Sequence, residues 1–199
     1  MRMRTPHGPA RAHLHPADDP IGALVLGHGA GGGVSAPDLV GVTNAALERG
    51  ISVALVEQPY RVAGRRSPAP APQLDAAWAA VVDQLAAGPL EGLALACGGR
   101  SSGARVACRT AAATGAQAVL CLAFTVHPPG RPEKTRLDEL DGVKVPAFVV
   151  QGESDPFGMP PKRGGRTVLV VEGNHSLRKG VAAYAAKATD WLAARLGSR

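Results

Sequence analysis

Ser101 lies at the centre of a Gly-x-Ser-x-Gly pattern, with Gly99 two residues before it and Gly103 two residues after it. An apolar run precedes this pattern and an alanine-rich segment of helical character follows it. This is the context of a nucleophile elbow, a strained turn that presents one hydroxyl and tolerates only small residues two positions to either side. Centring the pattern on Ser102 would place Arg100 at one of those positions, where it does not fit. Ser101 is therefore the candidate nucleophile, and a glycine-rich turn without chemistry is the alternative.

A serine hydroxyl becomes a good nucleophile when a histidine takes its proton and a carboxylate orients that histidine. Asp155 and His175 each follow a predicted strand, and they come after the serine in the order Ser, Asp, His that accompanies this type of elbow. Each also has a structural alternative. Asp155 precedes Pro156, a common start of a turn, and His175 precedes a helix that Asn174 or Ser176 could cap. The shared position after strand ends favours a Ser101–His175–Asp155 triad.

The negative charge that develops on an attacked carbonyl oxygen needs hydrogen-bond donors. The backbone N–H of Ser102 is one candidate. Ala30 is the other, because the glycines around it would let the backbone of residues 28–31 approach a substrate. We expect His28, in the same segment, to contact the substrate. The alternative for this segment is a tight glycine-rich turn that binds nothing.

Apolar runs typical of strands buried on both faces alternate with segments of helical pattern. The expected strands are 21–26, 51–56, 92–96, 118–124, 145–150 and 166–171, and the longer expected helices are 39–47, 74–85, 104–113 and 177–196. This alternation predicts a three-layer α/β fold in residues 20–199, with about six or seven strands in a mostly parallel sheet and helices on both faces. Residues 1–19 are expected to form an N-terminal arm or an edge strand. Reactive groups should gather where the strands end.

A dinucleotide-binding domain is the rival interpretation of the first glycine-rich loop. Gly27, Gly29 and Gly32 match Gly-x-Gly-x-x-Gly after a strand, and Glu57 ends the next strand 25 residues beyond Gly32. In that motif, however, the helix opens within the glycines, whereas Gly33 and the residues after it delay the helix here. This interpretation also gives no role to the candidate triad.

The composition argues against several classes of function. The three cysteines, Cys97, Cys108 and Cys121, are odd in number and have no Cys-x-x-Cys spacing, so we expect buried free thiols and no metal site. The net charge of +6 is spread along the chain and aromatic residues make up only 4%, which argues against a nucleic-acid partner. No apolar run reaches the length of a membrane span. We therefore expect a cytoplasmic protein without a membrane partner.

The chain resembles the α/β-hydrolase superfamily over residues 20–196. The resemblance rests on the segments 27–32, 99–103, 124–132, 151–158 and 174–177. It is closest to the dienelactone-hydrolase-like branch that includes the testis-expressed and NSL-complex-subunit hydrolase domains. The resemblance implies nucleophile Ser101, acid Asp155 and base His175, with no metal or organic cofactor. Two features differ: dienelactone hydrolases proper have cysteine at the elbow, so their substrate is not carried over, and no cap domain is expected.

Without a cap, residues 58–72 and 125–136 should roof an open cleft. Both segments carry cations, among them Arg131, and Arg100 lies in the elbow itself. Because arginine binds carboxylate and phosphate well, we hypothesise that these residues contact an anionic substrate; solvated surface charge is the alternative. We expect a serine hydrolase that cleaves a small-molecule ester or thioester through an acyl-enzyme. A catalytically silent binding subunit is the alternative, and a homodimer is left open.

Overall fold

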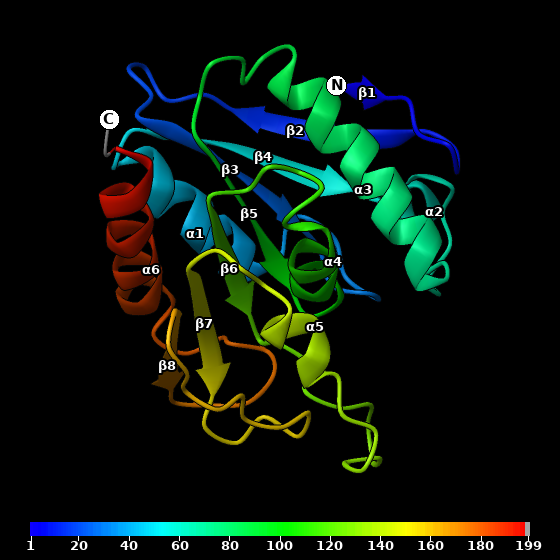
Figure 1. The fold of residues 1–199 in the computed structure, drawn as a ribbon, viewed down its shortest axis with the longest axis vertical. Coiled ribbons are helices and arrows are strands. Elements are labelled where there is room, and N and C mark those ends of the chain that lie inside the picture. The colour runs from blue at the N-terminus through cyan, green and yellow to red at the C-terminus, as the bar shows by residue number, and fades with distance from the viewer. Residues whose placement is uncertain (198–199) are drawn as a thin grey trace.

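Eight strands form one sheet in residues 1–197, the part of the chain that the computed structural model describes (Figure 1). The sheet has the order β1-β2-β4-β3-β5-β6-β7-β8. The strands are β1 (Arg2–Met3), β2 (Ala10–His15), β3 (Gly22–Gly27), β4 (Ile51–Glu57), β5 (Leu95–Arg100), β6 (Ala118–Leu122), β7 (Ala147–Gly152) and β8 (Arg166–Val171). The sheet thus has eight strands where about six or seven were expected, because residues 2–15 add two short strands to its edge. Ser198 and Arg199, the end of the expected domain, lie outside the described residues.

The strands from β3 to β8 pair in parallel, whereas β1 and β2 are antiparallel to their neighbours. All six residues of β3 are buried, as are the five of β6 and the six of β7. Such strands are apolar throughout because both faces of the sheet are covered. The parallel arrangement brings the carboxyl ends of β5, β7 and β8 to one edge, where the loops that carry the candidate triad begin.

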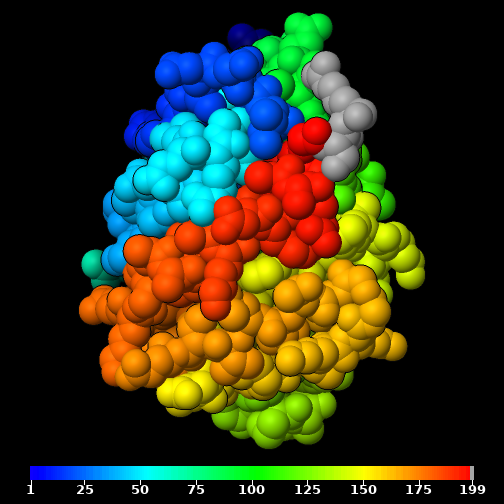
Figure 2. Space-filling view, turned by 90° about the vertical axis from the view of Figure 1, so that its left-hand side faces the viewer, coloured from blue at the N-terminus to red at the C-terminus, as the bar shows by residue number. Residues whose placement is uncertain are grey.

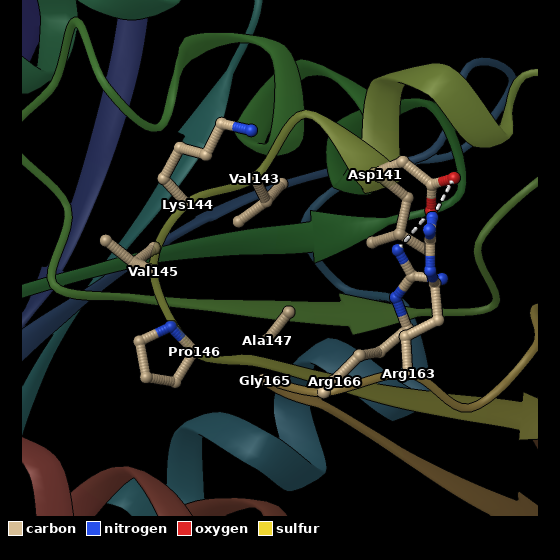
Figure 3. Close-up of a pocket in the computed structure, with 11 residues that line it drawn as sticks. Asp141, Val143, Lys144, Val145, Pro146, Ala147, Arg163, Gly165 and Arg166 are labelled. Carbon is tan, nitrogen blue, oxygen red and sulfur yellow. Dashed lines mark hydrogen bonds and ion pairs between the residues drawn. The ribbon is translucent and has the colours of Figure 1, made fainter.

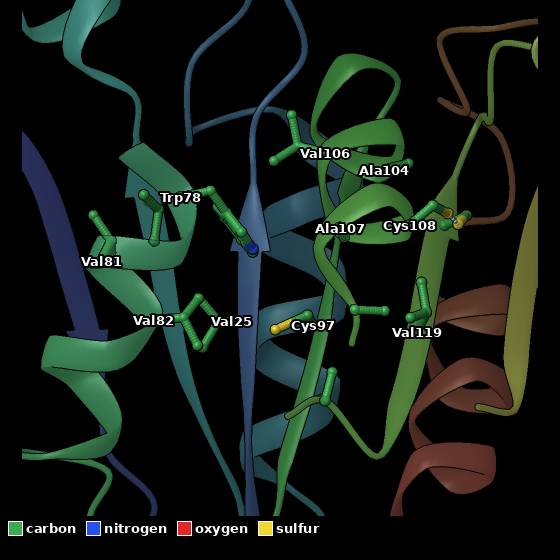
Figure 4. Close-up of a cluster of buried hydrophobic side chains, with 14 of the residues drawn as sticks. Val25, Trp78, Val81, Val82, Cys97, Ala104, Val106, Ala107, Cys108 and Val119 are labelled. Carbon is green, nitrogen blue, oxygen red and sulfur yellow. Dashed lines mark hydrogen bonds between the residues drawn. The ribbon is translucent and has the colours of Figure 1, made fainter. Parts of the chain in front are cut away.

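Helices cover both faces of the sheet (Figure 1). The first face carries α1 (Pro37–Leu47) and α6 (Val181–Leu196), and the second carries α2 (Pro59–Val62), α3 (Ala71–Ala86), α4 (Ser102–Thr110) and α5 (Leu137–Asp141). In Figure 4, Trp78 of α3 and Val106 of α4 extend toward the sheet, with Val25 and Val119 beneath them. The three-layer α/β fold is confirmed, and no cap domain covers the sheet in residues 1–197.

The last helix packs along α1 on the first face of the sheet, as Figure 2 shows from outside. Tyr184, Ala188 and Leu192 recur every fourth residue and are buried, which is the pattern of a helix with one apolar face. The helix begins at Val181 and not at residue 177 as expected. Leu177 has a positive φ of 47° and Gly180 one of 62°, so the chain turns twice between His175 and the helix.

Candidate active site

Ser101 forms a strained turn between β5 and α4. Its backbone has φ 53° and ψ −107°, a conformation that costs energy for any residue with a Cβ. The turn is held by a hydrogen bond from the Ser101 N–H to the Leu122 carbonyl, 2.8 Å long. A Cβ on Gly99 would lie 2.5 Å from the Gly27 carbonyl oxygen, and one on Gly103 would lie 2.4 Å from the same atom. Only glycine fits at these two positions, which is the geometry expected of an elbow centred on Ser101.

The structure brings Ser101, His175 and Asp155 together from three separate loops. His175 Nε2 lies 3.0 Å from Ser101 Oγ, and His175 Nδ1 lies 2.8 Å from Asp155 Oδ2. With the proton on Nδ1, the imidazole donates to the carboxylate and accepts from the serine hydroxyl. The Asp155 side chain is fully buried, whereas that of His175 is 18% exposed. Asp155, at one end of this series of hydrogen bonds, is therefore shielded from solvent. His175, which lies nearer to where a substrate would bind, is accessible.

Two neighbours of the candidate triad could not be assigned from the sequence. Gln151 is fully buried at the end of β7, and its Nε2 donates to Asp155 Oδ2 at 2.9 Å and to the Phe124 carbonyl at 3.0 Å. The Phe157 N–H donates to Asp155 Oδ1 at 2.9 Å, and the Phe157 ring packs on the His175 imidazole with centroids 4.3 Å apart. A buried amide in an otherwise apolar strand is the one signal that could have drawn attention to Gln151.

The two candidate oxyanion donors lie beside the elbow. Ser102 is the first residue of α4, so its N–H has no acceptor within the helix. A Cβ built on Gly29 would stand 3.7 Å from Ser101 Cβ, which shows how closely the Ala30 loop approaches the serine. The Ala30 carbonyl accepts a hydrogen bond of 2.8 Å from the Tyr60 hydroxyl. Burial raises the pKa of Tyr60 to about 12, so this hydroxyl stays protonated and fixes the loop.

The side chain of His28, which the sequence predicts to contact the substrate, is buried in the protein. Its Nδ1 donates to the Gly29 carbonyl at 2.8 Å, and its Nε2 accepts the N–H of Gln58 at 3.1 Å. Both ring nitrogens are therefore used by the backbone, and burial lowers the pKa of the imidazole. His28 is a neutral support for the glycine-rich loop.

Arg100, which the sequence predicts to bind an anionic substrate, makes its polar contacts within the protein. Its Nε lies 2.7 Å from Asp38 Oδ2, and its Nη2 donates to the His175 carbonyl at 2.9 Å. Arg131 stands on the exposed loop between β6 and α5, which projects from the sheet in Figure 1. Within residues 1–197 no hydrogen bond or ion pair joins Arg131 to the candidate triad.

The dinucleotide-binding alternative does not fit the structure. The helix after the glycine-rich loop begins only at Pro37, so its N-terminus does not receive a phosphate held by the glycines. Glu57, the residue that would bind the ribose, pairs with His13 Nε2 at 3.0 Å and with Arg11 at 3.6 Å on the neighbouring strand. The Glu57 carboxylate is therefore already paired with side chains of β2.

A cavity of about 400 Å³ lies at the opposite end of the sheet (Figure 3). It is lined by residues around Ala147 and Arg166, which begin β7 and β8, whereas Asp155 and His175 follow the ends of those strands. Asp141 pairs there with Arg163 at 2.5 Å and with Arg166 at 2.6 Å. This cavity is separate from the candidate active site.

Two further observations apply to the described part of the chain only. In residues 1–197, no three side chains of His, Cys, Asp or Glu gather into a possible metal site. No helix of that range has both the length and the apolar character needed to cross a bilayer.

Solved structures of several hydrolases have the same fold. A serine hydrolase without lid from Xanthomonas campestris is 20% identical, with a TM-score of 0.79 over 100% of this chain and 95% of that one. Est1E from Butyrivibrio proteoclasticus, solved with ferulic acid bound, is 14% identical, with a TM-score of 0.80 over 100% of both chains. Dienelactone hydrolase from Anabaena variabilis is 17% identical, with a TM-score of 0.77 over 98% and 96%. No curated protein sequence matches the chain.

The family comparison agrees with these structural neighbours. A family model described as an alpha/beta hydrolase domain matches residues 20–190, which is most of the chain. The same span contains the elbow, the two loops that carry Asp155 and His175, and the glycine-rich loop at Ala30. The chain therefore belongs to the alpha/beta hydrolase domain family.

Proposed function

We propose that this protein is a serine hydrolase that cleaves an ester or a thioester through an acyl-enzyme intermediate. The observation that carries the proposal is the unbroken series of hydrogen bonds from Asp155 through His175 to Ser101, which ends on a hydroxyl in a strained elbow. A neutral imidazole that accepts from the hydroxyl and donates to a buried carboxylate is the arrangement that activates serine.

In the first half of the reaction, Ser101 Oγ attacks the carbonyl carbon and His175 Nε2 takes the hydroxyl proton. The backbone N–H groups of Ala30 and Ser102 would hold the oxygen that becomes negative. The C–O or C–S bond then breaks, and His175 gives its proton to the departing alcohol or thiol. In the second half, water attacks the acyl carbon while His175 Nε2 takes a proton from that water. The bond between the acyl carbon and Ser101 Oγ then breaks, His175 returns the proton to Oγ, and the carboxylic acid leaves.

We further propose a small-molecule acyl substrate, since no cap covers the edge of the sheet in residues 1–197. Recognition of an anionic group would fall to exposed cations such as Arg131, because Arg100 is engaged with Asp38. Within the superfamily, residues 127–132 (His-Pro-Pro-Gly-Arg-Pro) support a place in the dienelactone-hydrolase-like branch, near the testis-expressed and NSL-complex-subunit domains. A cytoplasmic location is part of the same proposal.

The test is labelling with a fluorophosphonate probe, which reacts with activated serine hydroxyls. The wild-type protein should be labelled, and Ser101→Ala should not. Ser102→Ala is the matched control, because it removes the neighbouring hydroxyl while keeping the backbone N–H, and it should still be labelled. An unlabelled wild-type protein would favour a catalytically silent binding subunit, and labelling that survives Ser101→Ala would show that another residue is the nucleophile.

A further inference from the structure

Arg100 joins the elbow to the segment that carries His175. It is the residue immediately before Ser101, at the end of β5. Its side chain is 19% exposed, and its Nη2 donates a hydrogen bond of 2.9 Å to the His175 carbonyl. One side chain therefore connects the backbone of the candidate nucleophile with the backbone of the candidate base.

Asp38 forms an ion pair with the same guanidinium. Its carboxylate is fully buried in the first turn of α1, with Oδ1 accepting the Leu39 N–H at 2.9 Å and Oδ2 paired with Arg100 Nε at 2.7 Å. Burial raises the pKa of Asp38, and the positive charge of Arg100 opposes that shift. A buried carboxylate is costly without a cation, so α1 and the elbow are held together by this pair.

The remaining contacts show why this link bears on the imidazole. Two residues beyond His175, the Leu177 carbonyl accepts a hydrogen bond of 2.8 Å from the Tyr184 hydroxyl on α6. The segment is thus anchored at residues 175 and 177, and Arg100 provides the anchor at the base itself. Because both bonds are made to backbone oxygens, they set where the His175 Cα lies relative to Ser101 and Asp155.

We propose that Arg100 is a positioning residue, which holds His175 in line between Ser101 and Asp155 while Asp38 serves as its counter-ion. This inference rests on the proposed hydrolase function. It assigns Arg100 to the geometry of the base and not to recognition of an anionic substrate. A displacement of the imidazole by about 1 Å is enough to cost catalysis on the order of 100-fold.

The decisive variant is Arg100→Lys. Lysine keeps a positive charge opposite Asp38, so the fold is retained, but its ammonium does not reproduce the planar fork that reaches both Asp38 and the His175 carbonyl. Arg105→Lys is the matched control. Arg105 lies on α4, its side chain is 20% exposed, and it pairs with Glu139 of α5 and with no residue of the candidate triad.

For Arg100→Lys we expect kcat for ester hydrolysis to fall by about 10- to 100-fold, as for other residues that orient a catalytic group through a second contact. KM should change less than twofold, for neutral and anionic esters alike. The low-field proton resonance of the His175–Asp155 hydrogen bond should broaden or shift in the NMR spectrum. Arg105→Lys should leave kcat, KM and this resonance unchanged.

Three results would overturn the inference while leaving the proposed hydrolase intact. One is a labelled, active Arg100→Lys protein with the wild-type kcat and an unaltered resonance. The second is a rise in KM restricted to anionic esters, which would make Arg100 a substrate-binding residue. The third is an equal loss in Arg105→Lys, which would indicate a general effect on folding. If the wild-type protein itself is neither labelled nor active, the proposed function fails, and the inference fails with it.

Discussion

Two networks of charged side chains meet helix α4, one at its N-terminal end and one on its outer face, and they are built differently. At the N-terminal end, two successive hydrogen bonds link Asp155 to His175 and His175 to Ser101. The ion pair of Arg100 with Asp38 belongs to the same network. On the outer face, two arginines and two carboxylates bind each other from three helices. These residues are Arg105 and Arg109 of α4, Asp75 of α3 and Glu139 of α5.

The difference lies in where each network ends. Arg109 binds both oxygens of Asp75, and Glu139 binds both arginines. Every charge of the outer network thus has a partner within it, so we call this network closed; it joins α3 and α5 to α4. The network at the N-terminal end is open, because it ends on the Ser101 hydroxyl, which lies in a strained turn. Substitutions in the closed network should therefore affect stability, whereas substitutions in the open network should affect catalysis.

The largest effect is expected for His175→Ala, which removes the base from the open network. Ester hydrolysis should fall by about 10⁴-fold or more, as it does when a triad histidine is lost. Asp155 keeps its hydrogen bonds from Gln151 and from the Phe157 N–H when the imidazole is removed, so the melting temperature should change little. The measurement is kcat beside thermal unfolding. Activity within tenfold of wild type would remove His175 from the mechanism.

Glu139→Gln should show the opposite behaviour. It leaves Arg105 and part of Arg109 without their carboxylate, and the free energy of unfolding should fall by about 1–3 kcal/mol, the usual cost of losing a charged hydrogen-bond partner in a partly buried site. Turnover by the folded protein should be unchanged. Urea unfolding and kcat measured on the same preparation check both statements. A large loss of kcat without loss of stability would show that the two networks are coupled.

His28 supports the glycine-rich loop without belonging to either network. Its pKa is lowered in the folded protein, so the unfolded chain binds the proton more readily. The stability that neutral His28 contributes is therefore present above pH 6.5 and is lost as the pH falls below it. This loss approaches about 1.4 kcal/mol per pH unit. His28→Gln, which keeps an acceptor for Gln58, should flatten this part of the pH profile in urea unfolding, and an unchanged profile would argue against a buried neutral His28.

The smallest effect is expected of the thiols beneath the helices. Burial raises the pKa of Cys97 to about 12, and contact with Cys121 and burial raise the pKa of Cys108. Since the thiolate is the reactive form, the native protein should react with a disulfide reagent at pH 8 far more slowly than the protein in urea. Rapid reaction of the native protein would show that the second face of the sheet opens readily.

Much of the fold, and the selection of the candidate triad, can be derived from local sequence. Six of the eight strands overlap the apolar runs of the sequence, although β5 spans Leu95–Arg100 and not 92–96 as expected. The elbow register follows from the lack of space at Gly99 and Gly103. Ser101, Asp155 and His175 could be selected because each follows a strand of one parallel sheet. Strand β1 was missed because two residues carry no pattern.

The supporting residues could not be predicted, since their contacts form only in the folded chain. The sequence suggests that Arg100 binds substrate, because nothing in it shows that Asp38, far away in the chain, is buried against the guanidinium. The sequence suggests that His28 contacts a substrate, because its neighbours are glycines. The direction of its ring, however, depends on a hydrogen bond from Gln58 in another loop. The roles of Gln151 and Phe157 likewise depend on tertiary contacts with Asp155 and His175.

Trapping the acyl-enzyme would show whether Ser101 is the nucleophile. The protein is mixed with an activated ester such as a nitrophenyl acetate, quenched with acid during the burst, and analysed by intact mass and peptide fragmentation. If Ser101 is the nucleophile, each chain should carry one acyl group, located on Ser101 and absent in Ser101→Ala. An acyl group on Ser102 or on any other residue, or turnover of the ester without an acyl intermediate, would contradict this assignment.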